Sequence, residues 1–266
     1  MSDETPQQIN TNVAHPARVY DYWLGGKDNF PADREAAKQA IAALPSIIPS
    51  ARANRAFLRR VVHHLAAEAG IRQFLDIGTG LPTNPNVHEV AQAAIPDARI
   101  VYVDNDPIVL VHARALLTSR PEGVTTYLDA DLRDPDAILR AAAATLDFTQ
   151  PVAVLLVAIL QFVGPDEDAH GIVARLVDAL PPGSYLAMSH PAKDIDPEAI
   201  AEFVKKMNRM ASVEYTMRTV DEVARFFDGL ELVEPGMTQI HRWHPDDPTT
   251  DLTREFPMHA AVARKP

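Results

Sequence analysis

The chain has 266 residues, of which 47% are hydrophobic and 23% charged, so it is long enough to bury one substantial core with a small appended unit. Its 36 acidic residues outnumber 25 basic ones, and the net charge of −11 opposes sustained contact with a nucleic-acid backbone or an anionic membrane. The absence of cysteine excludes disulfides and thiolate metal sites. We therefore expect a cytoplasmic protein without nucleic-acid or membrane partners; no pattern indicates an oligomeric state.

The first seventy residues are expected to form a helical cap. They begin with the polar, acidic stretch MSDETPQQINTNVAHP, which lacks the basic start and apolar segment of a secretory signal. The segment PSARANRAFLRRVVHHLAAEAG then has apolar residues at helical spacing from Phe57 to Leu65, with Arg52, Arg55 and Arg59 along another face. An arginine face of this kind is typical of a solvated helix surface.

From about residue 71, short apolar runs alternate with amphipathic segments, which predicts a parallel sheet with helices on both faces. The expected strands are RQFLDI, RIVYVD, VTTYLDA, VAVLLVAIL and SYLAMSH, and the helices between them are expected at about 85–94, 107–118, 136–144 and 168–180. The run VAVLLVAIL is too short for the roughly 20 residues of a membrane helix and is typical of a strand buried on both faces. We therefore expect a cap over residues 1–70 and a core over residues 71–266.

Two of these helices are predicted to start directly after a strand. Asn84 followed by Pro85, and Asp106 followed by Pro107, suit an N-cap and a first helical position. In parallel sheets the amino termini of helices and the loop amides converge at the carboxyl ends of the strands. We therefore expect a ligand at that edge of the sheet.

The last part of the chain adds elements to this pattern. Helices are expected at about 197–210 and 220–227, followed by the strands GLELVEPG and PMHAAVARK with a loop of about twenty residues between them. A late pair of strands added to a five-stranded parallel core indicates a seven-stranded, mostly parallel sheet with an antiparallel last strand.

The stretch QFLDIGTGLPT places an acid and two glycines at the end of the first expected strand. Glycine allows backbone amides to approach a ligand closely. A dinucleotide site would have the pattern G-x-G-x-x-G, whereas here Pro82 and Thr83 occupy its end. Asp76 stands where a pyrophosphate would be expected, and a carboxylate repels a diphosphate but attracts an amino-acid moiety and a sulfonium. The turn therefore favours a cationic ligand.

The ends of the second and third strands suggest what that ligand is. Asp104, in VYVDND, follows Gly80 by 24 residues and suits the two ribose hydroxyls of an adenosine. An adenosine with a positively charged tail describes S-adenosylmethionine. In DADLRDP, Asp131 is placed to accept a hydrogen bond from the adenine amine while Leu132 packs on the ring. The alternative is that Asp131 caps a turn before Pro135.

Six stretches together resemble the actinobacterial S-adenosyl methyltransferase family, formerly described as a domain of unknown function. They are ARVYDYWLGGKDNF, PSARANRAFLRR, FLDIGTGLPT, VHEVAQ, VYVDNDPIVL and FFDGLELVEPG. The resemblance implies a Rossmann-like class I methyltransferase fold, an α/β sheet that binds S-adenosylmethionine, but it implies no acceptor. The cofactor-binding residues that it implies are Asp76, Gly78, Thr79 and Gly80 in the turn, Asp104 with its neighbour Asn105, and Asp131 with Leu132.

The amino-terminal signature YDYWLGGKDNF suits a lid that folds over the ligand. Its expected contacts are the flat rings of Tyr20, Tyr22 and Trp23, the backbone near Gly26, and a carboxylate-binding charge from Lys27 or Arg52. The alternative is a structural turn that joins two cap helices.

Methyl transfer requires little covalent work of a protein, because the sulfonium already activates the methyl carbon and the acceptor only needs alignment. A general base is needed only if the acceptor must lose a proton, and His190 and His241 are the candidates. Where the family has histidine after the fourth strand, this chain has Gln161, which weakens an acid-base role there. The histidines offer no third ligand at familiar spacing, so no metal is expected.

We therefore predict a methyltransferase that acts on a small-molecule acceptor. One alternative is a non-catalytic protein that binds S-adenosylmethionine as a sensor or partner. Another is an NAD(P)-dependent oxidoreductase, which rests only on the Gly-x-Gly turn and the acid of the second strand.

Overall fold

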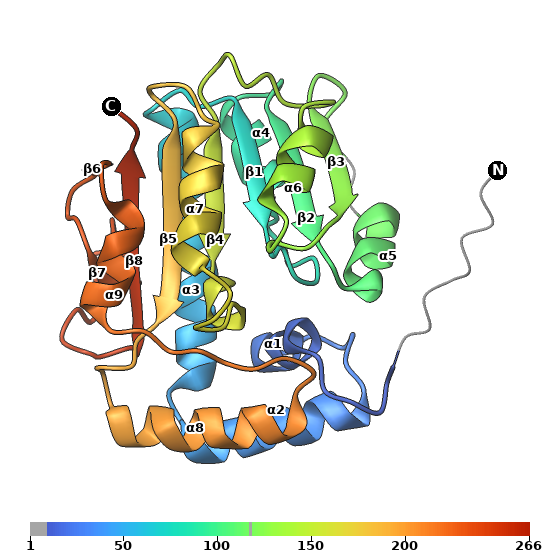
Figure 1. Ribbon diagram of the computed structural model, residues 1–266, viewed down its shortest axis with the longest axis vertical. Helices are drawn as coiled ribbons and strands as arrows, with labels where there is room; N and C mark the ends of the chain where they lie inside the picture. The colour runs from blue at the N-terminus through green and yellow to red at the C-terminus, as the bar shows by residue number, and fades with distance from the viewer. Residues whose placement is uncertain (1–9, 117–118) are drawn as a thin grey trace.

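The computed structural model describes residues 10–116 and 119–266 (Figure 1). One sheet within these residues contains β1 (Gln73–Ile77), β2 (Arg99–Asp104), β3 (Val124–Asp129), β4 (Ala153–Val157), β5 (Tyr185–Pro191), β6 (Glu231–Leu232), β7 (Thr238–Gln239) and β8 (Met258–Arg264). The strand order is β3-β2-β1-β4-β5-β8-β6, and β7 also pairs with β8. Strands β1 to β5 are parallel and β8 is antiparallel to β5, which confirms the expected sheet.

Of the expected late strand GLELVEPG only β6 forms, and a second short strand, β7, follows just beyond it. Both β6 and β7 pair with β8, β6 opposite Ala263 and Arg264 and β7 opposite His259 and Ala260, so they share one edge position. Pro235, which has no N–H for a strand ladder, lies between them. The sheet consequently has eight strands in seven positions.

Helices cover both faces of the sheet, as predicted (Figure 1). One face carries α3 (Ile47–Ala67) and α4 (Val87–Ala94), and the other carries α6 (Pro135–Ala142), α7 (Ala169–Asp178), α9 (Val220–Ala224) and the 3-10 turn η2 (Arg225–Phe227). Helix α5 (Pro107–Leu116) packs against β3. Among the residues described, no helix combines the length and apolar character needed to cross a membrane.

Two predicted helix starts have different outcomes. Ile108 N donates to the Asp106 carboxylate at 2.9 Å, so Asp106 caps α5 as expected. The start at Asn84 and Pro85 is wrong, because α4 begins two residues later, with Asn86 as its N-cap. The Asn86 N–H donates to the Glu89 carboxylate at 2.6 Å and completes a capping box. The expected end of α5 near residue 118 lies outside the described residues.

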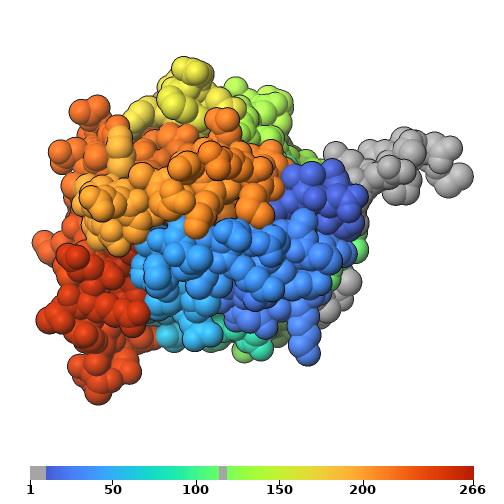
Figure 2. All heavy atoms as spheres, turned by 90° about the horizontal axis from the view of Figure 1, so that it is seen from below, coloured from blue at the N-terminus to red at the C-terminus, as the bar shows by residue number. Residues whose placement is uncertain are grey.

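A helical layer lies across the carboxyl ends of the parallel strands (Figure 1). It contains α1 (Pro16–Leu24), α2 (Pro31–Ala43), the start of α3 and the late helix α8 (Pro197–Met210), which share one apolar core. Viewed from below, the N-terminal helices in blue and the segment around α8 in orange cover this side of the molecule together (Figure 2). The cap therefore includes a part of the chain beyond residue 70, while the end of α3 packs on the sheet. The division at residue 70 stays a prediction.

A buried ion pair fixes α1 against α2. Arg18 donates to the Asp33 carboxylate at 2.9 Å, and both side chains are almost inaccessible. Asp33 also accepts from the backbone N–H groups of His15 and Phe30, at 2.9 and 2.8 Å. Because the buried carboxylate is hydrogen-bonded as well as paired, it holds the start of both helices in place.

Candidate functional site

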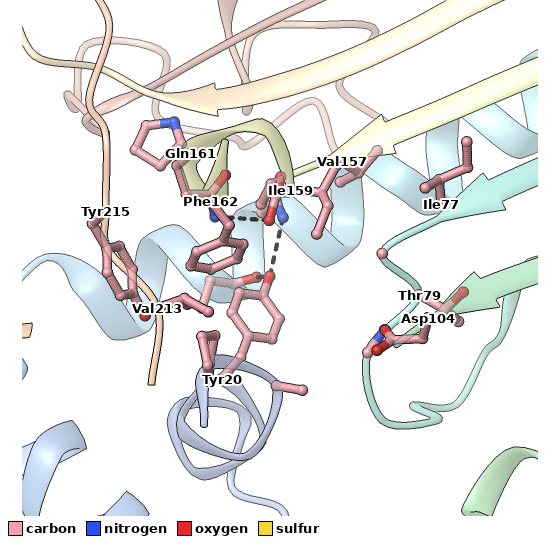
Figure 3. A pocket seen from close by; sticks show the side chains of 18 of the residues that line it. Tyr20, Ile77, Thr79, Asp104, Val157, Ile159, Gln161, Phe162, Val213 and Tyr215 are labelled. Carbon is pink, nitrogen blue, oxygen red and sulfur yellow. Dashed lines mark hydrogen bonds between the residues drawn. The ribbon is translucent and has the colours of Figure 1, made fainter. Parts of the chain in front are cut away.

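A cavity of about 190 Å³ lies between the carboxyl ends of β1, β2 and β4 and the helical layer. Its wall has two parts (Figure 3). The polar lobe contains Asp76, Gly78, Thr79, Gly80, Asp104, Asn105, Asp131 and Leu132. The aromatic lobe contains Tyr20, Trp23, Phe162, Ile200, Phe203, Val213, Tyr215 and Met217. The eight residues predicted at the ends of the first three strands thus lie on one cavity.

The turn after β1 has the backbone that the sequence predicts. Gly78 and Gly80 adopt φ values of +76° and +66°, which other residues rarely adopt. Gly78 N donates to Val103 O at 2.8 Å, and a Cβ at Gly78 would lie 2.4 Å from Ile159. A Cβ at Gly80 would meet no atom within 4 Å. The turn therefore packs closely at Gly78 and leaves open space at Gly80, where a ligand can approach the backbone.

The carboxyl group of Asp76 is buried on the cavity wall without a partner. Its exposure is 4%, and it makes no hydrogen bond or ion pair with another described residue. Burial raises the pKa of Asp76 to about 7; nearby Arg55 acts to lower it and Asp104 to raise it. Such a group needs a positive charge to ionise fully, so it fits a cationic ligand and disfavours a diphosphate.

Asp104, at the end of β2, is held by two backbone amides. One carboxylate oxygen accepts from Gly80 N at 2.8 Å and the other from Asp106 N at 2.9 Å. Burial raises the pKa of Asp104, and these two hydrogen bonds oppose the rise. Because each carboxylate oxygen accepts two hydrogen bonds, the fixed side chain retains capacity for two further donors, such as ribose hydroxyls.

Asp131 makes the turn contact that was the alternative to adenine binding. Its carboxylate accepts from Arg133 N at 2.9 Å and from Asn105 Nδ2 at 3.0 Å. Burial acts to raise the pKa of Asp131, but these bonds and the Arg133 charge lower it below its usual value. The group is therefore an ionised, fixed acceptor, and adenine binding by Asp131 and Leu132 stays a prediction.

The predicted lid residues Tyr22, Gly26, Lys27 and Arg52 do not line the cavity. Lys27 and Arg52 are exposed. The signature around them is a turn between α1 and α2, in which Asp21 accepts from Asp28 N at 3.0 Å and from Asn29 Nδ2 at 2.8 Å. A side chain at Gly26 would overlap the Asp21 carboxylate. These contacts are those of the structural-turn alternative, while Tyr20 and Trp23 do line the cavity.

Arg55 takes the place on the wall that was expected for Arg52. It lies on the same helix three residues later, and its guanidinium donates to Thr83 O at 3.3 Å and Pro85 O at 3.4 Å. An arginine has five N–H donors, so these two contacts leave others for a ligand. Helical spacing alone could not separate Arg55 from the solvated arginines beside it.

Neither predicted base candidate lies on the cavity. The His190 ring is fully buried between Arg218, at 2.9 Å from Nε2, and Pro191 O, at 2.8 Å from Nδ1, and burial lowers its pKa to about 3. His241 packs against the Phe256 ring, and burial lowers its pKa too. These contacts are structural, so the geometry argues against a general-base role for either histidine.

The wall near Tyr20 includes residues that the sequence did not indicate. Tyr20 Oη donates to Ala51 O at 3.0 Å and accepts from Asn54 Nδ2 at 3.1 Å, and the Asn54 oxygen accepts from Ser189 Oγ at 2.6 Å. This series of hydrogen bonds joins α1, α3 and β5 at the cavity. In the part of the chain that the structure describes, no three His, Asp or Glu side chains are grouped to hold a metal ion.

Ile159, Gln161 and Phe162 reach the cavity because β4 ends earlier than expected. The expected strand VAVLLVAIL continues to Leu160, but Ala158 adopts a φ of +54° and turns the chain out of the sheet. The short helix η1 (Leu160–Phe162) follows, and it lies beside the aromatic lobe (Figure 3).

Comparison with known proteins identifies the family of the chain. A family model described as S-adenosyl methyltransferase matches residues 2–266. A crystal structure of a DUF574 family protein from Streptomyces avermitilis is 50% identical, with 97% of this chain and 100% of that chain covered and a TM-score of 0.94. A proposed methyltransferase from Thermobifida fusca is 42% identical, with 99% of each chain covered and a TM-score of 0.89.

More distant structures agree in fold. Human N-acetylserotonin methyltransferase, crystallised with SAM, is 12% identical, with 87% of this chain and 57% of that chain covered and a TM-score of 0.51. No curated protein matches the chain. Since the family model extends over almost every residue and the glycine turn, Asp76 and Asp104 lie together on the cavity, the chain belongs to the S-adenosyl methyltransferase family, which uses S-adenosylmethionine as its methyl donor.

Proposed function

We propose that this methyltransferase transfers the methyl group in line to a small-molecule acceptor held in the aromatic lobe. The observation that carries the proposal is the unpartnered, buried carboxyl group of Asp76 on the wall shared with that lobe. A cationic methionine moiety beside Asp76 would complete its charge balance, whereas a dinucleotide would place negative charge there.

The residues of the polar lobe have complementary parts in holding the cofactor. Asp104 binds the ribose hydroxyls with its remaining acceptor capacity. The open backbone at Gly80 allows close approach. Asp131 and Leu132 border the adenine, and Arg55 binds the carboxylate of the methionine moiety with its free N–H donors.

The chain contributes alignment and exclusion of water rather than covalent chemistry. When bound, S-adenosylmethionine supplies a methyl group that leaves its sulfonium for the nucleophilic atom of the acceptor, with a neutral thioether as the second product. The aromatic rings fix the plane of the acceptor, and the helical layer covers the cavity from below (Figure 2). This enclosure supports a small molecule, because a polymer needs an open approach.

Isothermal titration calorimetry with S-adenosylmethionine, S-adenosylhomocysteine and NADH tests the cofactor part. We expect the first two to bind and NADH not to bind. Asp104→Ala should weaken binding by roughly 1–3 kcal/mol if its carboxylate holds the ribose. The exposed Asp129→Ala, at the end of the neighbouring strand, is the matched control and should leave affinity unchanged.

Turnover is tested separately, with labelled S-adenosylmethionine and fractionated small molecules from cell extract. Transfer of label to a small molecule supports the proposal. Transfer to protein or nucleic acid alone would contradict the small-molecule acceptor. Cofactor binding with no transfer to any fraction would instead favour a sensor or partner role.

A further inference from the structure

Five aromatic rings form a continuous arc in the aromatic lobe, although they come from distant parts of the chain. The ring of Tyr20 lies 6.1 Å from that of Trp23, Trp23 lies 6.2 Å from Phe203, Phe203 lies 5.6 Å from Tyr215, and Tyr215 lies 5.0 Å from Phe162. All five line the cavity. The faces and edges of such rings complement a flat apolar molecule.

The side chains of the aromatic lobe carry no charge. The only ionisable groups among its eight residues are the two tyrosines, and burial raises the pKa of both, so they stay protonated at neutral pH. Elsewhere on the wall, Asp76 and Arg55 are occupied by the cofactor in the proposed function, and the Asp21 carboxylate accepts from Asp28 N and Asn29 Nδ2. Arg133 is paired with Glu167 at 2.5 Å and with Asp131 at 3.2 Å. A charged acceptor would therefore lose its hydration in this lobe without gaining a partner.

The Tyr215 hydroxyl is the polar group available to a ligand in this lobe. The residue is only 7% exposed, and its hydroxyl makes no hydrogen bond with any described residue. The Tyr20 hydroxyl, by contrast, is already bonded to Ala51 and Asn54. Beside the lobe, Gln161 Oε1 is also buried without a partner, while its Nε2 donates to Ala158 O at 2.7 Å. Buried polar atoms without hydrogen-bond partners favour a ligand that forms a hydrogen bond with them.

We infer that the aromatic lobe binds an uncharged aromatic molecule whose polar substituent hydrogen-bonds to the Tyr215 hydroxyl. The inference rests on the proposed function in one respect, since it takes this molecule to be the methyl acceptor. Carboxylic acids, phosphorylated compounds and cationic amines are disfavoured as ligands of the lobe.

The test is an NMR titration with three probes of one shape and different charge. These probes are 2-naphthol, 2-naphthoate and 2-(aminomethyl)naphthalene, each added with and without saturating S-adenosylhomocysteine. We expect 2-naphthol to bind at least about tenfold more tightly than either charged probe, because only the charged probes lose hydration without a partner. Equal or tighter binding of a charged probe, or no binding of 2-naphthol, would overturn the inference.

Two variants locate the binding. Tyr215→Phe keeps the ring and removes only the hydroxyl, so 2-naphthol affinity should fall about 3- to 10-fold, the value of one hydrogen bond. Val213→Trp should fill the lobe and abolish 2-naphthol binding, whereas Glu214→Trp, on the exposed side of the same loop, should not. Unchanged 2-naphthol affinity in both Tyr215→Phe and Val213→Trp would place the probe elsewhere and refute the inference.

S-adenosylhomocysteine binding separates the two proposals. If the variants bind it like the wild type, they are folded and the polar lobe is intact. If the wild type does not bind it, the proposed function fails, but the titrations without it still decide which probe enters the aromatic lobe.

Discussion

Binding of S-adenosylmethionine should release a proton from Asp76. In the free protein the buried carboxyl group has a pKa of about 7, so about half of the molecules carry the proton at neutral pH. The positive charges of the ligand favour the ionised carboxylate and pull the pKa back toward its usual value of 3.8. Protonated molecules must therefore lose the proton before they bind well.

The size of the effect follows from that pKa. With that pKa, the Asp76 carboxyl group of the free protein is about one-tenth protonated at pH 8 and about nine-tenths protonated at pH 6. If the group is ionised in the complex, the affinity for S-adenosylmethionine should fall about tenfold, or about 1.4 kcal/mol, from pH 8 to pH 6. Proton release should be about half a proton per binding event at pH 7 and should approach one proton at pH 6.

Calorimetry in buffers of different ionisation enthalpy measures this release directly. Adenosine is the matched ligand control, because it lacks both the sulfonium and the ammonium group and should release no proton at Asp76. Asp76→Asn should remove the pH dependence between pH 6 and pH 8. An affinity for S-adenosylmethionine that is independent of pH in the wild type, or proton release that persists in Asp76→Asn, would refute the assignment.

Three further predictions concern residues on the same cavity wall. Because folding raises the pKa of Asp76, the folded protein loses stability as pH rises from about 4 to about 7. Asp76→Asn should therefore raise the free energy of unfolding, measured in urea titrations, by up to about 4 kcal/mol at pH 8 and by less at pH 5. Gly78→Ala should cost about 1–3 kcal/mol more than Gly70→Ala, which has a similar φ but no neighbour within 4 Å, and only Gly78→Ala should lose cofactor binding. Arg55→Gln should weaken S-adenosylmethionine about 10- to 100-fold and leave adenosine unchanged, whereas the exposed Arg52→Gln should alter neither.

Alternating apolar runs were sufficient to predict the sheet and the edge at which the cavity lies. The strand RIVYVD agrees with β2 at both ends, and the helix expected at 197–210 agrees with α8. Asp76, Gly78 and Asp104 were predicted on one cavity because strand ends in a parallel sheet meet at one edge. Local sequence determines these features, so one sequence carries the signal for them.

The remaining site residues depend on contacts that periodicity does not encode. Arg52 and Arg55 lie on the same helix, and only the packing of α3 on the loop after Gly80 separates the exposed arginine from the one on the wall. Phe203 and Tyr215 join Tyr20 across almost two hundred residues of sequence, which no local pattern indicates. The burial of His190 beside Arg218 is likewise a tertiary contact, and it keeps this predicted base candidate off the cavity wall.

The two lobes of the cavity are built from different parts of the chain. The polar lobe is formed by the turns that end β1, β2 and β3, whose positions are fixed by the strand ladder. The aromatic lobe is formed mainly by α1, α8 and the loop that contains Val213 and Tyr215, which pack through side chains and through two backbone hydrogen bonds of the loop, Ser212 N to Ala14 O and Thr216 N to Gln161 O. Substitutions in the second group should therefore change the shape of the aromatic lobe without moving Asp76 or Asp104. If the aromatic lobe holds the acceptor and the polar lobe the cofactor, as we propose, acceptor choice can vary on this scaffold while the cofactor site stays constant, because the strand ladder does not pass through the aromatic lobe.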